Sequence, residues 1–203
     1  MRPKLVLFGD SITEESFGEG GWGAALAHHF SRKVSTTATA SLSWSIASGF
    51  VLGRAMEGVC PDGVAPPEAV AVFFGANDAS LPDRCSGFQH VPLPEYQSNL
   101  RAICAYLRVY LVKITRSTCL DLPKNTIGFS AGLILKVINL EDRCHASCDF
   151  RDGLHFTASG NSVLFDEVVK KLGDEGLSLE ALPVDLPYLG DMDPNDPLKS
   201  FCD

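Results

Sequence analysis

Two short apolar runs, each followed at once by glycine and polar residues, constrain the fold of this chain most strongly. Residues 4–8 read KLVLF and lead into Gly-Asp-Ser11, while residues 69–74 read AVAVFF and lead into Gly-Ala-Asn77-Asp. Such runs are typical of buried strands in a parallel sheet. Because ligands of these sheets bind beyond the carboxyl ends of the strands, we expect the Ser11 hydroxyl and the Asn77 carboxamide to share one rim.

Three segments with helical features accompany these strands. We expect helices over residues 22–30 and 95–111, from the spacing of their apolar residues, and a last helix capped by Thr157 that runs to Leu172. The apolar face expected for the last helix consists of Phe165, Val168, Val169 and Leu172. Strands that alternate with helices indicate an α/β fold, with a parallel sheet covered on both faces.

Other segments are less regular. Residues 34–48 are rich in Ser, Thr and Ala and have no clean period, residues 49–59 could continue as a helix, and residues 126–140 fit a strand, a helix or both. A chain of 203 residues suits one domain, which we place at residues 1–182. Residues 183–203 carry four prolines and several aspartates, and we expect them to form an irregular acidic tail.

Charge and targeting features narrow the partners. The formal net charge is −8 and no basic cluster stands out, so we expect no nucleic acid partner. Five apolar residues near the amino terminus are too few for a signal peptide, and no run is long enough for a membrane helix. The expected location is therefore the cytoplasm. The oligomeric state is open.

Seven cysteines and no export signal favour free thiols. Cys144-His-x-x-Cys148 resembles half of a zinc site, but a second ligand pair with suitable spacing is missing. We therefore expect no metal site and no cofactor.

The polar residues at the expected rim could transfer an acyl group. That reaction needs a nucleophile, a base and donors for the oxyanion. Ser11 is the candidate nucleophile, and Asn77 can donate to an oxyanion. Asp152-Gly-Leu-His155, just before the last helix, offers a carboxylate that can orient an imidazole. Taken singly, each of these residues fits an ordinary turn as well.

The combination resembles the GDSL (SGNH) hydrolases. Residues 8–13 (FGDSIT), 74–78 (FGAND) and 152–155 (DGLH) are similar to three blocks of that family and occur in the same order. Longer stretches are similar to a plant subgroup near the isoamyl-acetate-hydrolysing esterases. The resemblance implies a three-layer α/β/α fold and a serine esterase that acts on small carboxylic esters through an acyl-enzyme.

The resemblance also implies roles for individual residues. Ser11 would be the nucleophile, with Asp152 and His155 completing the triad. The backbone N–H of Ser11 and the side chain of Asn77 would be oxyanion donors. Asp10 and Gly75, next to these groups, are expected to contribute to substrate binding.

Two segments depart from the family. Residues 34–52 have no convincing counterpart of the block that supplies a third oxyanion donor, and Gly49 is the nearest candidate. Residues 108–149 resemble nothing in the family and are shorter than expected, so the sheet could be incomplete. Impaired activity is therefore expected. A non-catalytic binding protein on the same scaffold, a thioesterase and a carbohydrate O-deacetylase are the alternatives.

A nucleotide site is a further rival, because Gly18-Glu-Gly-Gly-Trp-Gly23 fits the pattern G-x-G-x-x-G. The expected strand ends well before Gly18, however, and no acidic residue occurs between Glu19 and Glu57 to bind a ribose. We interpret these glycines as a loop.

Overall fold

A parallel sheet forms the centre of the computed structural model. The structure describes residues 2–40, 67–110, 133–134, 150–152, 154–185, 188–196 and 198–199. The described strands are β1 (Lys4–Gly9), β2 (Ser35–Ala40), β3 (Ala69–Phe73) and β4 (Leu133–Ile134). They pair in parallel in the order β2-β1-β3-β4.

The sheet brings the predicted rim together. Gly9 at the end of β1 lies opposite Ala40 of β2 and Phe73 of β3, so the three strands end level with one another. The chain order reverses between β1 and β3, and such a switch point opens a crevice at the carboxyl ends of the strands. Ser11 follows β1 and Asn77 follows β3, at this crevice.

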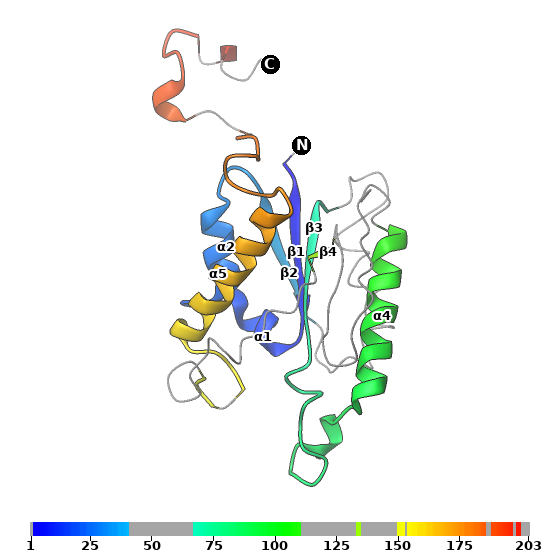
Figure 1. Cartoon of the computed structure of the whole chain (residues 1–203). Coiled ribbons are helices and arrows are strands. Elements are labelled where there is room, and N and C mark those ends of the chain that lie inside the picture. Colours follow the sequence, from blue (N-terminus) through cyan, green and yellow to red (C-terminus); the bar gives the residue numbers. More distant parts are fainter. Residues whose placement is uncertain are drawn as a thin grey trace.

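Helices cover both faces of the sheet (Figure 1). The longer ones are α2 (Trp22–His29), α4 (Leu93–Tyr110) and α5 (Ala158–Asp174), and a short α1 (Ser11–Glu14) begins directly after β1. Single 3₁₀ turns occur at Glu15–Phe17, Gly87–Gln89 and Leu189–Asp191. Figure 1 shows α2 and α5 on one side of the sheet and α4 on the other, which confirms the three-layer α/β/α fold.

The alternating side chains of β1 divide the core into two parts. Leu5 and Leu7 pack with residues of α2 and α5, whereas Val6 and Phe8 pack with residues of α4. These four side chains are at most 2% exposed. A strand buried on both faces explains the continuous apolar run, because neither face can accept polar side chains.

Most of the expected elements are confirmed, with shifts at their ends. α4 begins two residues before the expected Glu95. The predicted apolar face of α5 is confirmed, because Val168 and Leu172 are buried and Phe165 and Val169 are partly buried against the same core. Leu164, which the prediction did not include, is also buried. Phe165 is only half-buried and packs edge-on against the His29 ring of α2, at 5.6 Å between ring centroids.

One strand was not predicted, and some predictions concern residues that the structure does not describe. β2 occupies residues 35–40, where the sequence showed no period. Residues 41–66 lie outside the described part of the chain, as do Cys144 and Cys148 and most of residues 111–149. The prediction for residues 49–59 therefore stays a prediction.

The tail contacts the body of the protein near the amino ends of the strands and then extends away from it (Figure 1). Arg2 donates to both carboxylate oxygens of Asp185, at 2.6 and 2.8 Å. The Arg32 guanidinium lies 3.7 Å from the centre of the Tyr188 ring. The beginning of the tail is thus held by specific contacts. A domain boundary at residue 182 stays a prediction.

Candidate active site

Ser11 is placed by the junction between β1 and α1. It is the first residue of α1, and Asp10 before it is the N-cap, whose Oδ1 accepts the Ile12 backbone N–H at 3.1 Å. The Trp22 indole N–H donates to the Ile12 carbonyl at 3.2 Å, which ties α1 to α2. The Ser11 side chain is half-buried and lies at the crevice.

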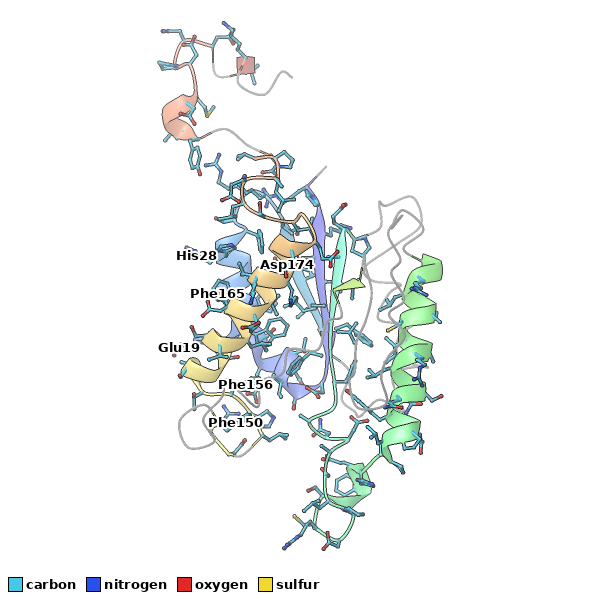
Figure 2. The ribbon with its side chains drawn as sticks, viewed as in Figure 1. Glu19, His28, Phe150, Phe156, Phe165 and Asp174 are labelled. Atoms are coloured by element: carbon cyan, nitrogen blue, oxygen red, sulfur yellow. The ribbon has the colours of Figure 1, made fainter. Side chains whose placement is uncertain are left out.

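A short closed loop holds the candidate acid–base residues. Phe150 and Phe156 pair through an isolated antiparallel bridge, and their rings are 5.1 Å apart (Figure 2). The Arg151 N–H donates to the His155 carbonyl at 2.8 Å. Thr157 then caps α5 by accepting the Gly160 N–H at 3.3 Å. These contacts fix the backbone on both sides of His155.

Asp152 accepts three hydrogen bonds within this loop. Its Oδ1 accepts the backbone N–H groups of Leu154 and His155, at 3.0 and 2.8 Å. Its Oδ2 lies 2.7 Å from Nδ1 of His155. The hydrogen bond from the His155 ring, followed by those from the backbone, holds the pKa of Asp152 well below its usual range. Asp152 is therefore ionised at any pH of interest.

The imidazole connects this loop to Ser11. Nε2 of His155 lies 2.9 Å from Oγ of Ser11. When Nδ1–H donates to the Asp152 carboxylate, Nε2 carries a lone pair and can accept the Ser11 hydroxyl proton. The structure thus brings together three predicted residues, Ser11, Asp152 and His155, although 140 or more positions separate the first from the other two.

The loop after β3 forms the other side of the crevice. Gly75 has φ +122°, which favours glycine, and a Cβ at this position would lie 2.7 Å from the Tyr96 hydroxyl. The Tyr96 O–H donates to the Phe74 carbonyl at 3.0 Å and so ties this loop to α4. Asn77 is half-buried, and no described residue hydrogen-bonds its side-chain amide.

Two carboxylates are buried beneath the crevice. Asp10 is 1% exposed and Asp78 is 4% exposed. Burial, and next the charge of Asp78, raise the pKa of Asp10 to about 6, although the Ile12 N–H acts in the opposite direction. The burial of Asp10 favours a role in holding α1 over the predicted contact with substrate.

The sequence analysis missed other parts of this site. Arg151 donates to both carboxylate oxygens of Glu15, at 3.2 and 2.9 Å, and links the acid–base loop to the turn after α1. Nothing in the sequence indicated this pair. Gly75 was expected to contribute to substrate binding, and its close neighbour Tyr96 was not predicted. Gly49, the predicted third donor, lies outside the described residues.

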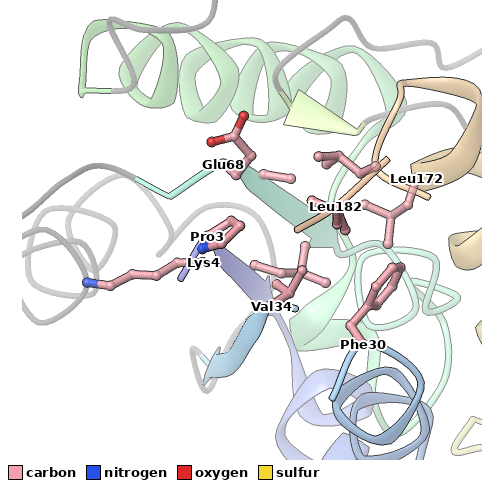
Figure 3. A pocket seen from close by; sticks show the side chains of 10 residues that line it. Pro3, Lys4, Phe30, Val34, Glu68, Leu172 and Leu182 are labelled. Carbon is pink, nitrogen blue, oxygen red and sulfur yellow. The ribbon is translucent and has the colours of Figure 1, made fainter. Parts of the chain in front are cut away.

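An apolar pocket lies at the other end of the sheet (Figure 3). Pro3, Phe30, Val34, Leu172 and Leu182 are among the residues that line it. Lys4 and Glu68, at the amino ends of β1 and β3, also belong to it. It is therefore separate from the crevice that holds Ser11.

Comparison with known proteins agrees with the site and the fold. The family described as GDSL-like Lipase/Acylhydrolase matches residues 5–138. A GDSL esterase/lipase of Arabidopsis thaliana is 42% identical, over 99% of this chain and 98% of that protein. The human isoamyl acetate-hydrolyzing esterase 1 homolog is 30% identical, over 94% and 88%. The chain belongs to the GDSL-like lipase/acylhydrolase family, a class of carboxylic ester hydrolases.

Solved structures support the same fold. TesA superposes with a TM-score of 0.55 at 18% identity, over 84% of this chain and 98% of that chain. A catalytic mutant of Axe2, an acetylxylan esterase from Geobacillus stearothermophilus, gives a TM-score of 0.56 at 15% identity, over 85% and 96%. These similarities show the fold.

The chain is nevertheless shorter inside than its plant relative. That alignment runs over 240 positions and this chain has 203 residues, so at least 37 positions (240 − 203) have no residue here. Since the alignment reaches nearly both ends of both proteins, these gaps are internal. The prediction that they fall in residues 108–149 remains a prediction. Within the described residues, no helix is long and apolar enough to span a membrane.

Proposed function

We propose that this chain hydrolyses small carboxylic esters through an acyl-enzyme formed on Ser11. The observation that carries the proposal is the continuous pair of hydrogen-bond distances, 2.9 Å from Ser11 Oγ to His155 Nε2 and 2.7 Å from His155 Nδ1 to Asp152 Oδ2. A weakly acidic hydroxyl becomes a useful nucleophile when an oriented base stands ready to take its proton.

The reaction follows from this arrangement. His155 Nε2 takes the hydroxyl proton while Oγ of Ser11 attacks the ester carbonyl carbon, and the ionised Asp152 stabilises the imidazolium. The imidazolium then gives the proton to the departing alkoxide, which leaves as an alcohol. Water attacks the acyl-enzyme with His155 again as base, and this step releases the carboxylic acid and restores Ser11.

Two groups are expected to stabilise the oxyanion. The N–H of Ser11 belongs to the first residue of α1, so it has no partner within that helix. The Asn77 side-chain amide is the second donor. Loss of one donor typically costs on the order of 10²–10³ in kcat. With no third donor identified, we expect slow turnover, and Asn77→Ala should remove most of the activity that remains.

Small esters are the proposed substrates. The human relative is named for the hydrolysis of isoamyl acetate, an ester with a two-carbon acyl group and a short alcohol. The apolar pocket at the amino ends of the strands belongs to the opposite end of the sheet and offers no site for an acyl chain on Ser11. A short acyl group needs no such pocket.

Hydrolysis of p-nitrophenyl acetate and of the corresponding ten-carbon ester tests this proposal. We expect measurable, saturable hydrolysis of the acetate and less of the longer ester. Ser11→Ala should abolish it, whereas Ser31→Ala, at an exposed turn after α2, should leave it intact. Hydrolysis by the Ser11→Ala protein at the wild-type rate would contradict the proposal.

A further inference from the structure

Asp10 is a buried acid that the esterase mechanism does not use. Its Oδ1 caps α1 through the Ile12 N–H, while its Oδ2 accepts no hydrogen bond from any described residue. An unsatisfied, 1% exposed carboxylate oxygen is costly, and a buried polar group of this kind asks for an explanation.

The titratable groups that act on Asp10 belong to three other parts of the fold. Asp78 follows β3, His155 lies on the loop before α5, and Tyr96 comes from α4. The charge of Asp78 opposes the ionisation of Asp10, whereas the charge of a protonated His155 favours it. Burial, and then the charges of Asp78 and Asp10, raise the pKa of Tyr96, so this phenol stays neutral.

The backbone holds these groups in register. The Asp10 N–H donates to the Phe73 carbonyl at 3.3 Å, which joins the ends of β1 and β3. The Asp78 carbonyl accepts the N–H of Val91, which is 4% exposed. These two hydrogen bonds fix the backbone at each of the two aspartates.

We propose that Asp10 is a positioning residue whose ionised carboxylate holds the Ser11 helix and supports the imidazolium of His155, so that the esterase works only when Asp10 has lost its proton. The inference rests on the proposed function, because it concerns the same Ser11 and His155. An ionised carboxylate accepts the Ile12 N–H more strongly than a neutral acid does. Its negative charge also favours the positive imidazole that forms during the reaction.

The pH range makes this inference testable. The pKa of Asp10, raised to about 6, lies close to the range of about 6–7 in which imidazole bases generally gain a proton. Two protonations should therefore switch the enzyme off together. At pH values below both pKa values, log kcat/KM should fall by two units for each unit of pH, whereas a single essential base gives a slope of one.

The experiment is a profile of kcat/KM for p-nitrophenyl acetate from pH 4.5 to 9, for the wild type and Asp10→Asn. Asn keeps the cap on α1, because its side-chain oxygen can accept the Ile12 N–H, but it cannot carry the charge. We expect a slope of two for the wild type. For Asp10→Asn we expect a slope of one and a plateau lowered by at least about a hundredfold, because the neutral amide stands in for the protonated acid.

Two further variants serve as controls. Asp78→Asn removes the negative charge that opposes the ionisation of Asp10, so the part of the profile that reports Asp10 should move to lower pH. Asp174→Asn should keep the slope of two, because this exposed residue lies at the end of α5 far from the loop of His155 (Figure 2). A slope of one in the wild type, or of two in Asp10→Asn, would overturn the inference.

Stability separates this inference from the proposed function. A carboxyl group with a raised pKa in the folded state makes the protein less stable as pH rises through about 4 to 6. The wild type should lose Tm over this range relative to Asp10→Asn even if neither protein hydrolyses an ester. Parallel Tm curves with an active wild type would overturn the inference alone, whereas an inactive wild type with diverging curves would overturn the proposed function and, with it, the catalytic part of the inference.

Discussion

Asp10 and Asp152 stand on opposite sides of the Ser11–His155 hydrogen bond and experience opposite environments. Asp10 is buried, faces a second carboxylate and has its pKa raised to about 6. Asp152 is exposed at the surface loop, accepts three hydrogen bonds and has its pKa lowered. Solvent access and hydrogen-bond donors, not residue type, thus decide which aspartate stays charged.

The difference follows from where the chain places each residue. Asp10 must lie under α1 because β1 is buried on both faces and turns directly into this helix. Asp152 lies in a loop whose backbone N–H groups turn toward it. A buried acid suits a switch that depends on pH, whereas a permanently ionised acid suits the orientation of an imidazole.

The largest expected effect concerns Asp152, the exposed aspartate. Asp152→Asn should lower kcat/KM by about 10³- to 10⁴-fold, because the amide favours the wrong imidazole tautomer. The steady-state rate for p-nitrophenyl acetate measures this loss, with Asp174→Asn as the matched control on α5. A loss as small as that expected for Asp10→Asn would remove the functional distinction between the two aspartates.

The next effect concerns Asp10, the buried aspartate, and the stability of the protein. Asp10→Asn should raise the free energy of unfolding at pH 7 by up to about 3 kcal/mol, because the variant carries no buried charge. Folding raises the pKa of Asp10 by about two units, from 3.8 to about 6, and at pH 7 this shift costs stability in the wild type. The gain should vanish at about pH 3 and below, under the unfolded pKa of 3.8, where Asp10 is largely protonated in both folded and unfolded states. Urea unfolding at both pH values measures it, and an equal gain at about pH 3 would assign the effect to packing.

Local sequence patterns were enough to predict β1, β3 and the loop that carries Asp152. Residues 4–8 and 69–74 predicted β1 and β3, and the motif of residues 152–155 predicted a carboxylate that orients an imidazole, as the 2.7 Å between Asp152 Oδ2 and His155 Nδ1 shows. These predictions worked because each feature depends on neighbours in sequence: apolar runs that end in glycine, and a carboxylate three residues before an imidazole.

Strand β2, the environment of Asp10 and the Arg151–Glu15 pair depend on contacts between segments that are distant in sequence. β2 reads STTATA and has no apolar period, so only its pairing with β1 reveals it as a strand. The pKa of Asp10 is raised first by burial and then by the charge of Asp78, which is distant in sequence and follows another strand. Arg151 meets Glu15 across 136 positions, and no local rule predicts that partner.

The smallest expected effect concerns this last pair. Arg151→Gln removes the bridge to Glu15 and a charge whose Nε lies 3.9 Å from Asp152. Because Arg151 and Glu15 are about half exposed, water screens the interaction, and kcat/KM should fall by less than about fivefold. Rates of Arg151→Gln, Glu15→Gln and the double variant measure the coupling. A hundredfold loss would mean that the bridge itself positions Asp152.

The most direct test of the account is labelling with a fluorophosphonate probe, which forms a covalent bond with an activated serine. Peptide mass mapping of the labelled wild-type protein should place the adduct on Ser11, and His155→Ala should label far more slowly under the same conditions. An adduct on another serine, or equal labelling of the His155→Ala protein, would contradict the assignment of Ser11, His155 and Asp152 as the catalytic triad.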